Sequence, residues 1–99
     1  MLKMAKSIMK DKKECFITGS TYNLKEHHIF FGTAKRKISE KYGLKVYLTA
    51  ELHRGTNGVH GKNGNLLDKK LKKIAQRKFE ETHTREEFIR LIGKNYLDN

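Results

Sequence analysis

Apolar residues recur with a helical period in the second half of the chain. Between residues 66 and 81 the apolar positions are three or four residues apart, and lysines fill most of the remaining positions. This spacing predicts an amphipathic helix over 66–81. A last, shorter helix is predicted after Thr84, because Thr84 and Glu87 have the spacing of a capping box and Gly93 follows the apolar pattern.

The first half of the chain has shorter patterns that favour strands. Residues 27–31 are an aromatic-rich stretch that ends at Gly32, and Leu44, Val46 and Leu48 alternate with polar or amphipathic residues. Each predicts a strand. The basic segment 35–41 between them predicts a short helix that Gly43 closes.

Two further segments have the composition of turns and loops. Residues 15–22 predict a short strand and a turn at Gly19, which makes a hairpin plausible. Residues 50–64 contain four glycines and two histidines, a composition that favours a ligand-rich loop over a packed element.

Composition and charge limit the partners that this protein can have. A chain of 99 residues with 36% apolar residues and no proline predicts one domain, which we place at 14–99 after an exposed basic arm at 1–13. A net charge of +11 predicts a polyanionic partner, and nucleic acid is the commonest one. The sequence contains no long apolar run that would predict a membrane partner. The single cysteine, Cys15, fits a reducing compartment, so we expect a cytoplasmic protein.

Four of the five histidines lie between positions 27 and 60. His27 and His28 are neighbours in a predicted strand, so their side chains point to opposite faces and need different roles. A set of His27, His53 and His60 would give a divalent ion three ligands with open positions, and His28 would then be the base that takes a proton from water. The alternative is that these histidines are ordinary surface or core residues, which is our interpretation of His83.

The residues around these histidines resemble a known family. The runs Glu26–Ala34, Ser39–Leu44 and Gly58–His60, the later Arg85–Ile89 and the closing Gly93–Leu97 are similar to phage HNH nucleases of the recombination enhancement, RecA-dependent nuclease family. The resemblance covers most of residues 15–97. It implies an α+β fold, in which a small ββα-metal (HNH-like) finger carries additional C-terminal helices.

By position, the resemblance implies that His27 is a metal ligand, that His28 is the general base, and that His53 and His60 are candidates for the other ligands. Family members often have two cysteine knuckles that bind a structural zinc. Here Cys15 is followed by Thr18, Thr49 and Leu52 at the other expected positions, which argues against a structural zinc. Packing around Cys15, Leu48 and Leu52 must then hold the finger together.

The residue that orients the base histidine is not assigned by the sequence. Many HNH enzymes use an asparagine for this purpose, and residues 41–49 contain none. A backbone carbonyl bonded to the other ring nitrogen is one way to orient the ring.

The expected activity is metal-dependent hydrolysis of DNA phosphodiester bonds. Mg, Mn or Zn are the candidate ions; imidazole ligands favour the softer metals. A RecA-type recombinase filament is a possible partner. We expect backbone contacts with little sequence selectivity, from basic residues of two segments: Lys35, Arg36, Lys37, Lys69, Lys70, Lys73 and Arg77. Two alternatives remain open: a catalytically inactive DNA-binding recombination accessory, and a phage-encoded inhibitor that binds an acidic host protein.

Overall fold

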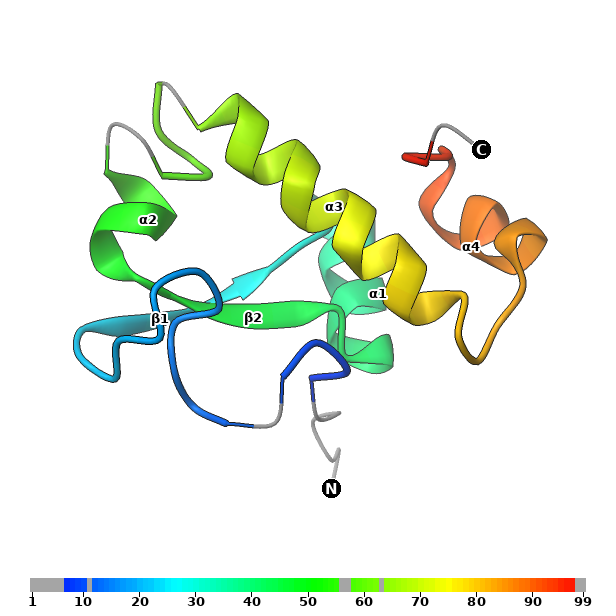
Figure 1. Cartoon of the computed structure of the whole chain (residues 1–99). Coiled ribbons are helices and arrows are strands. Elements are labelled where there is room, and N and C mark those ends of the chain that lie inside the picture. The colour runs from blue at the N-terminus through cyan, green and yellow to red at the C-terminus, as the bar shows by residue number, and fades with distance from the viewer. Residues whose placement is uncertain (1–6, 11, 56–57, 63, 98–99) are drawn as a thin grey trace.

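The protein is a small α+β protein with a two-stranded sheet and four helices in the part that the structure describes (Figure 1). This computed structural model describes residues 7–10, 12–55, 58–62 and 64–97. In chain order the elements are β1 (Leu24–His28), α1 (Thr33–Tyr42), β2 (Lys45–Thr49), α2 (Ala50–Arg54), α3 (Asn65–Phe79) and α4 (Arg85–Ile92).

The two strands pair antiparallel and place the histidine pair at the end of β1. His27 is opposite Val46 and His28 is opposite Lys45. The predicted strand at 27–31 is wrong in its extent, because β1 begins at Leu24 and ends at His28. Beyond His28 the hydroxyl of buried Ser39 accepts from the Phe30 amide at 3.0 Å and donates to its carbonyl at 2.8 Å. Phe30 is thereby bonded to α1 instead of to a strand.

Three predicted helices are confirmed, with ends that shift by a few residues. The α1 helix begins two residues before the predicted segment, and Gly43 ends it in the left-handed conformation at φ 71°. The predicted helix at 66–81 is α3. The last helix, α4, begins as the capping box predicts, because the Thr84 side chain accepts from the Glu87 amide at 3.0 Å.

The loop predicted for residues 50–64 is wrong at its beginning. Residues 50–54 form the short helix α2, which starts because the Thr49 side chain accepts from the Leu52 amide and caps it. Between Arg54 and the start of α3, the described residues form turns and bends, as the glycine content predicted. Residues 56, 57 and 63 are outside the described part.

The expected hairpin at 15–22 is also wrong. Cys15 and Ser20 close a tight turn on themselves, and Cys15 forms a single parallel bridge with Tyr47 instead of a strand. Residues 7–10 of the predicted exposed arm lie against the domain, because the Ile8 amide donates to the Gly43 carbonyl and Met9 is buried in the core. Residues 1–6 and 11 of that arm are outside the described part.

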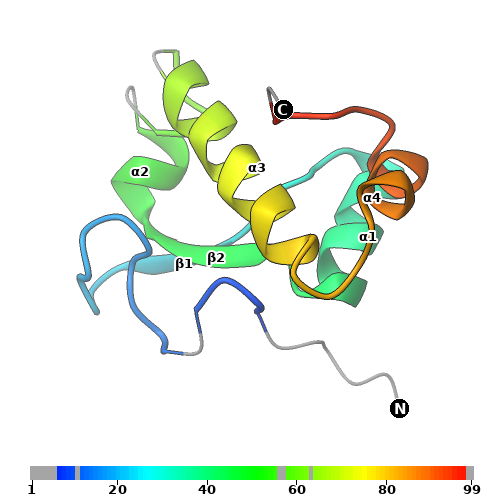
Figure 2. The same ribbon diagram turned by 45° about the vertical axis from the view of Figure 1, so that its right-hand side comes forward.

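The α3 helix lies across one face of the sheet, and α1 and α4 lie together at one end (Figure 2). The core contains Val46 and Leu48 of β2, and Leu71 and Phe79 of α3. Phe88 of α4 packs edge to face on the Phe30 and Phe79 rings. No helix in the described part of the chain is long and apolar enough to cross a membrane.

Candidate metal centre

Three histidines from separate segments meet beside the sheet. His27 is in β1, His53 is in α2, and His60 lies in the turns that follow α2. The ring centroids are 5.2 Å apart for His27 and His53, 5.2 Å for His27 and His60, and 4.8 Å for His53 and His60. One ring nitrogen of each lies within 4.8 Å of the others. The structure therefore brings together the three residues predicted as metal ligands.

Backbone hydrogen bonds hold the His60 segment against α2. The Val59 amide donates to the Leu52 carbonyl at 2.7 Å, and the His60 amide donates to the His53 carbonyl at 3.1 Å. Gly58 approaches the α2 backbone so closely that a Cβ atom there would lie 2.5 Å from the Leu52 carbonyl oxygen. A glycine at this position allows the two histidine-bearing segments to pack side by side.

The environment of these imidazoles favours their neutral form, which is the form that binds a metal. Burial, together with the positive charges that His53 and His60 would carry, lowers the pKa of His27 to about 3. Burial also lowers the pKa of His53 and of His60, with His60 and Arg54 respectively as the next causes.

One buried ring nitrogen at this site lacks a hydrogen-bond partner. Nε2 of His27 is buried and has no partner among the described residues, and the side chain is 1% exposed. An unpaired buried polar atom is costly unless a ligand satisfies it. Three neutral imidazoles, one of them with a buried free nitrogen, are ligands that suit a transition-metal ion. Ions such as Mg prefer sites made of oxygen ligands.

Phe31 and Lys72 border the cluster. The Phe31 ring centroid is 5.0 Å from that of His60, and the Lys72 ammonium lies 4.6 Å over the Phe31 ring. Lys72 is paired with Asp68 at 2.9 Å, and the Asp68 carboxylate raises the pKa of His60 against the larger effect of burial.

His28 belongs to a separate polar network on the opposite face of β1. Its Nε2 lies 2.8 Å from Glu40 Oε1 on α1 and 3.9 Å from Glu26 Oε1. Lys45, which is 5% exposed, donates to Glu40 at 2.7 Å and lies 3.5 Å from Glu26. Burial acts to lower the pKa of Lys45, but the two carboxylates outweigh it and raise that pKa. Lys45 in turn is the largest cause that lowers the pKa of Glu40.

These two groups of side chains open into one cavity. A hollow of about 240 Å³ is lined by the three-histidine cluster and by His28. The other lining residues are Glu26, Phe31, Arg36 and Arg54. The His28 side chain is 12% exposed, so its ring reaches this opening. The cavity therefore combines the three-histidine cluster, His28 and two guanidinium groups, which are donors suited to anionic oxygens.

The predicted DNA-contacting residues fall into two separate surfaces. Lys35, Arg36 and Lys37 are exposed on the first turns of α1, and a hollow of about 560 Å³ joins Arg36 and Lys37 to His28 and Glu40. The α3 residues Lys69, Lys70, Lys73 and Arg77 line a different hollow that has no histidine in its lining. Of the predicted contacts, only Arg36 and Lys37 of α1 line a hollow together with a histidine.

The four knuckle positions lie in two small turns. The Thr18 amide is 3.5 Å from Cys15 Sγ, and the Leu52 amide is 3.3 Å from Thr49 Oγ1. Cys15 and Leu48 are fully buried in the core, and Leu52 packs on it. The packing that the sequence predicted around these residues is therefore present.

Sequence reasoning missed Glu26, Glu40, Lys45 and Arg54 as members of the site. A signal existed for two of them: Glu26 is two residues before His28 in a strand, and Glu40 is one helical turn after Arg36. Lys45 could not be found because its place opposite His28 depends on the strand register. No family model, curated protein or solved structure matches this chain.

Proposed function

We propose that the protein is a metal-dependent endonuclease of the HNH kind that hydrolyses DNA phosphodiester bonds, in the cytoplasm of a bacterial cell and in phage recombination. In this proposal β1, β2 and the following helix are a ββα-metal finger. The observation that carries it is the shared cavity, which is lined both by the group His27, His53 and His60 and by His28.

The residues supply the parts that phosphodiester hydrolysis requires. His27, His53 and His60 would hold a divalent ion, Mg, Mn or Zn, which when bound supplies positive charge against the extra negative charge on the phosphate. Arg36 and Arg54 line the same cavity and add donors for phosphate oxygens.

The hydrogen bond to Glu40 fixes which nitrogen of His28 acts as the base. Nε2 faces the Glu40 carboxylate at 2.8 Å, so Nε2 carries the hydrogen and Nδ1 keeps its lone pair. Nδ1 takes a proton from water, and the water oxygen forms a bond to phosphorus. The bond from phosphorus to the leaving sugar oxygen breaks, and that oxygen takes a proton from solvent. Glu40 thus performs the orienting role that the sequence left open.

The test measures cleavage, metal binding and DNA binding separately. Wild type, His28→Ala, His27→Ala and the control His83→Gln are incubated with supercoiled and single-stranded DNA plus Mg, Mn or Zn, with and without a RecA-type recombinase filament. We expect His28→Ala to keep metal and DNA affinity and lose cleavage, and His27→Ala to lose metal and cleavage together. His83 stacks on Phe79, away from the cluster, so the His83→Gln control should cleave DNA like wild type.

Two outcomes would contradict the proposal. Equal DNA binding by all variants with no cleavage under any metal or partner would favour the inactive DNA-binding accessory. Failure to bind DNA, with binding to an acidic host protein that does not depend on the histidines, would favour the inhibitor.

A further inference from the structure

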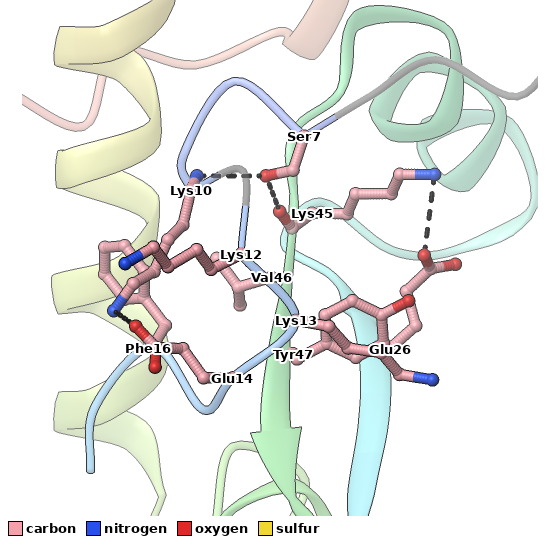
Figure 3. Close-up of a pocket in the computed structure, with 10 residues that line it drawn as sticks. All are labelled: Ser7, Lys10, Lys12, Lys13, Glu14, Phe16, Glu26, Lys45, Val46 and Tyr47. Carbon is pink, nitrogen blue, oxygen red and sulfur yellow. Dashed lines mark hydrogen bonds and ion pairs between the residues drawn. The ribbon is translucent and has the colours of Figure 1, made fainter. Parts of the chain in front are cut away.

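A second cavity lies beside the candidate metal centre, between the N-terminal segment and β2. It has a volume of about 320 Å³, and Ser7, Lys10, Phe16, Val46 and Tyr47 are among its lining residues. Figure 3 shows the N-terminal segment beside β2, with Lys10, Lys12 and Phe16 on one side of the strand and Lys45, Tyr47 and Glu26 on the other. Glu26 and Lys45 also line it, so it adjoins the network that contains His28.

The lining is basic, and two of its lysines are exposed. Four lysines and two glutamates contribute to it. Lys10 is paired with Glu14 at 2.8 Å, and Lys45 is paired with Glu40 and Glu26. Lys12 and Lys13 are exposed, and within the described part of the chain neither has a carboxylate partner within 4.0 Å. These two ammonium groups are the ones available to an incoming phosphate.

Two half-buried aromatic rings lie beside those lysines. The Phe16 amide donates to the Tyr47 carbonyl at 2.9 Å, which fixes the two residues next to each other. The Lys13 ammonium lies over one face of the Tyr47 ring, 5.4 Å from its centroid, so the opposite face is the one to which a base would stack. A phosphate-binding group beside an aromatic ring is the combination by which proteins bind unpaired nucleotides, with the base on the ring and the phosphate on the cation.

We propose that this cavity binds one unpaired nucleotide of the substrate strand, next to the phosphate that is cut. The proposal rests on the proposed function and names its substrate class as DNA with single-stranded character at the cut. A cavity of about 320 Å³ is at the lower end for small-ligand sites and suits one nucleotide. In a duplex the base is stacked and paired, so its face is not free for Tyr47.

The shared residue Glu26 gives the geometric reason for this assignment. Glu26 lines the second cavity, the cavity of the four histidines and the hollow between His28 and Arg36. The cavities are therefore neighbours, and a strand with one phosphate beside His28 would place an adjacent nucleotide at the second cavity. An acidic peptide would pair with the lysines but would leave the Tyr47 face unused.

The experiment measures binding without metal, so that no cleavage is needed. Fluorescence anisotropy with a chelator present compares a labelled oligonucleotide of about ten thymidines with the same strand in a duplex. The variants are Tyr47→Leu, Tyr47→Phe and Lys12→Gln/Lys13→Gln, with Lys69→Gln/Lys70→Gln on α3 as the charge-matched control. Thermal unfolding of each variant checks that it is folded.

We expect Tyr47→Leu to weaken single-strand binding by about 5- to 100-fold and duplex binding much less, because stacking of one base is lost. Tyr47→Phe should bind like wild type, because the ring is kept. The Lys12→Gln/Lys13→Gln variant should bind the single strand more weakly than the Lys69→Gln/Lys70→Gln control does.

Equal losses for single strand and duplex, or full single-strand affinity in folded Tyr47→Leu, would overturn the proposal. If Tyr47→Leu unfolds, the test is the Lys12→Gln/Lys13→Gln variant. A loss of single-strand affinity in this variant that is no larger than the loss in the α3 control also overturns the proposal. Metal-dependent cleavage that persists with no strand preference would refute this cavity alone and leave the nuclease assignment standing. A preserved preference for single strands without any cleavage would support this cavity and refute the nuclease assignment.

Discussion

At the scale of single residues, adjacent histidines have different surroundings because a strand alternates its faces. His27 is buried among imidazoles, and His28 is bonded to a carboxylate beside an open cavity. The sequence alone predicted that the two side chains have different surroundings, since this depends only on strand geometry. The partner of His28 could not be predicted, because Glu40 is brought to it by the packing of α1 on β1.

Glu40 should affect the cleavage rate without affecting the metal. Glu40→Ala removes the acceptor of the His28 Nε2 hydrogen, so we expect cleavage at saturating DNA to fall roughly 10- to 100-fold, as for other groups that orient a catalytic side chain. Glu40→Gln keeps an acceptor oxygen and should retain more of the activity. Calorimetric titration should give an unchanged metal affinity for both variants.

The control for this prediction is Glu51→Gln, which changes an exposed carboxylate on α2. Removal of Glu40 also leaves buried Lys45 with Glu26 as its remaining partner, so thermal unfolding should be measured alongside the rate. Wild-type cleavage by Glu40→Ala would refute the positioning role.

The buried imidazoles should make the metal-free protein sensitive to acid. The pKa of His27 is about 3 when folded and near its ordinary 6.5 when unfolded, so between these values the unfolded chain binds more protons. Its free energy of unfolding should therefore fall as pH falls, by about 2 kcal/mol from this histidine between pH 7 and pH 5. His53 and His60 act in the same direction.

Urea unfolding with a chelator at the two pH values measures this effect. His27→Leu cannot take up a proton and should show a clearly smaller pH dependence. An unchanged dependence in that variant would contradict the assigned cause.

At the scale of elements, the sequence predicted helices better than strand ends. The α3 and α4 helices follow from a sustained apolar period and a capping box, both of which are local signals. The end of β1 depends on Ser39, a residue of the next helix, whose hydroxyl bonds to both backbone groups of Phe30. The start of α2 depends on a threonine cap inside a glycine-rich segment, where the glycine signal is stronger than the cap.

The contact between α2 and the His60 segment predicts a metal-binding defect from a residue that is no ligand. In Gly58→Ala the new Cβ atom would lie 2.5 Å from two carbonyl oxygens of α2, so the backbone must move and carry His60 with it. We expect the metal affinity to fall roughly tenfold or more. Thr84→Ala, which removes the cap of α4 away from the site, is the control for lost stability. Equal metal affinity in Gly58→Ala and wild type would show that the segment tolerates the shift.

At the scale of the whole molecule, the sequence predicted the sign of the charge but not its distribution. A net charge of +11 predicted a polyanionic partner, and basic residues of two segments were the predicted contacts. Folding separates them: Arg36 and Lys37 share a hollow with His28, whereas the α3 lysines line one of their own. The distribution was not predictable because it depends on which face of α3 packs on the sheet.

This separation predicts two different kinds of DNA-binding defect. Changing Lys69, Lys70, Lys73 and Arg77 together to Gln should weaken binding and reduce the slope of log affinity against log salt by up to about 3.6 on duplex DNA, because fewer counterions are released. The cleavage rate at saturating DNA should not change, since these residues lie away from the histidines. Arg36→Gln should do the opposite: a small change of slope and a lower saturating rate, because its guanidinium lines the cavity of the four histidines. Anisotropy over a range of salt concentrations and single-turnover cleavage measure the two quantities, and a lower saturating rate in the α3 variant would place α3 in the reaction itself.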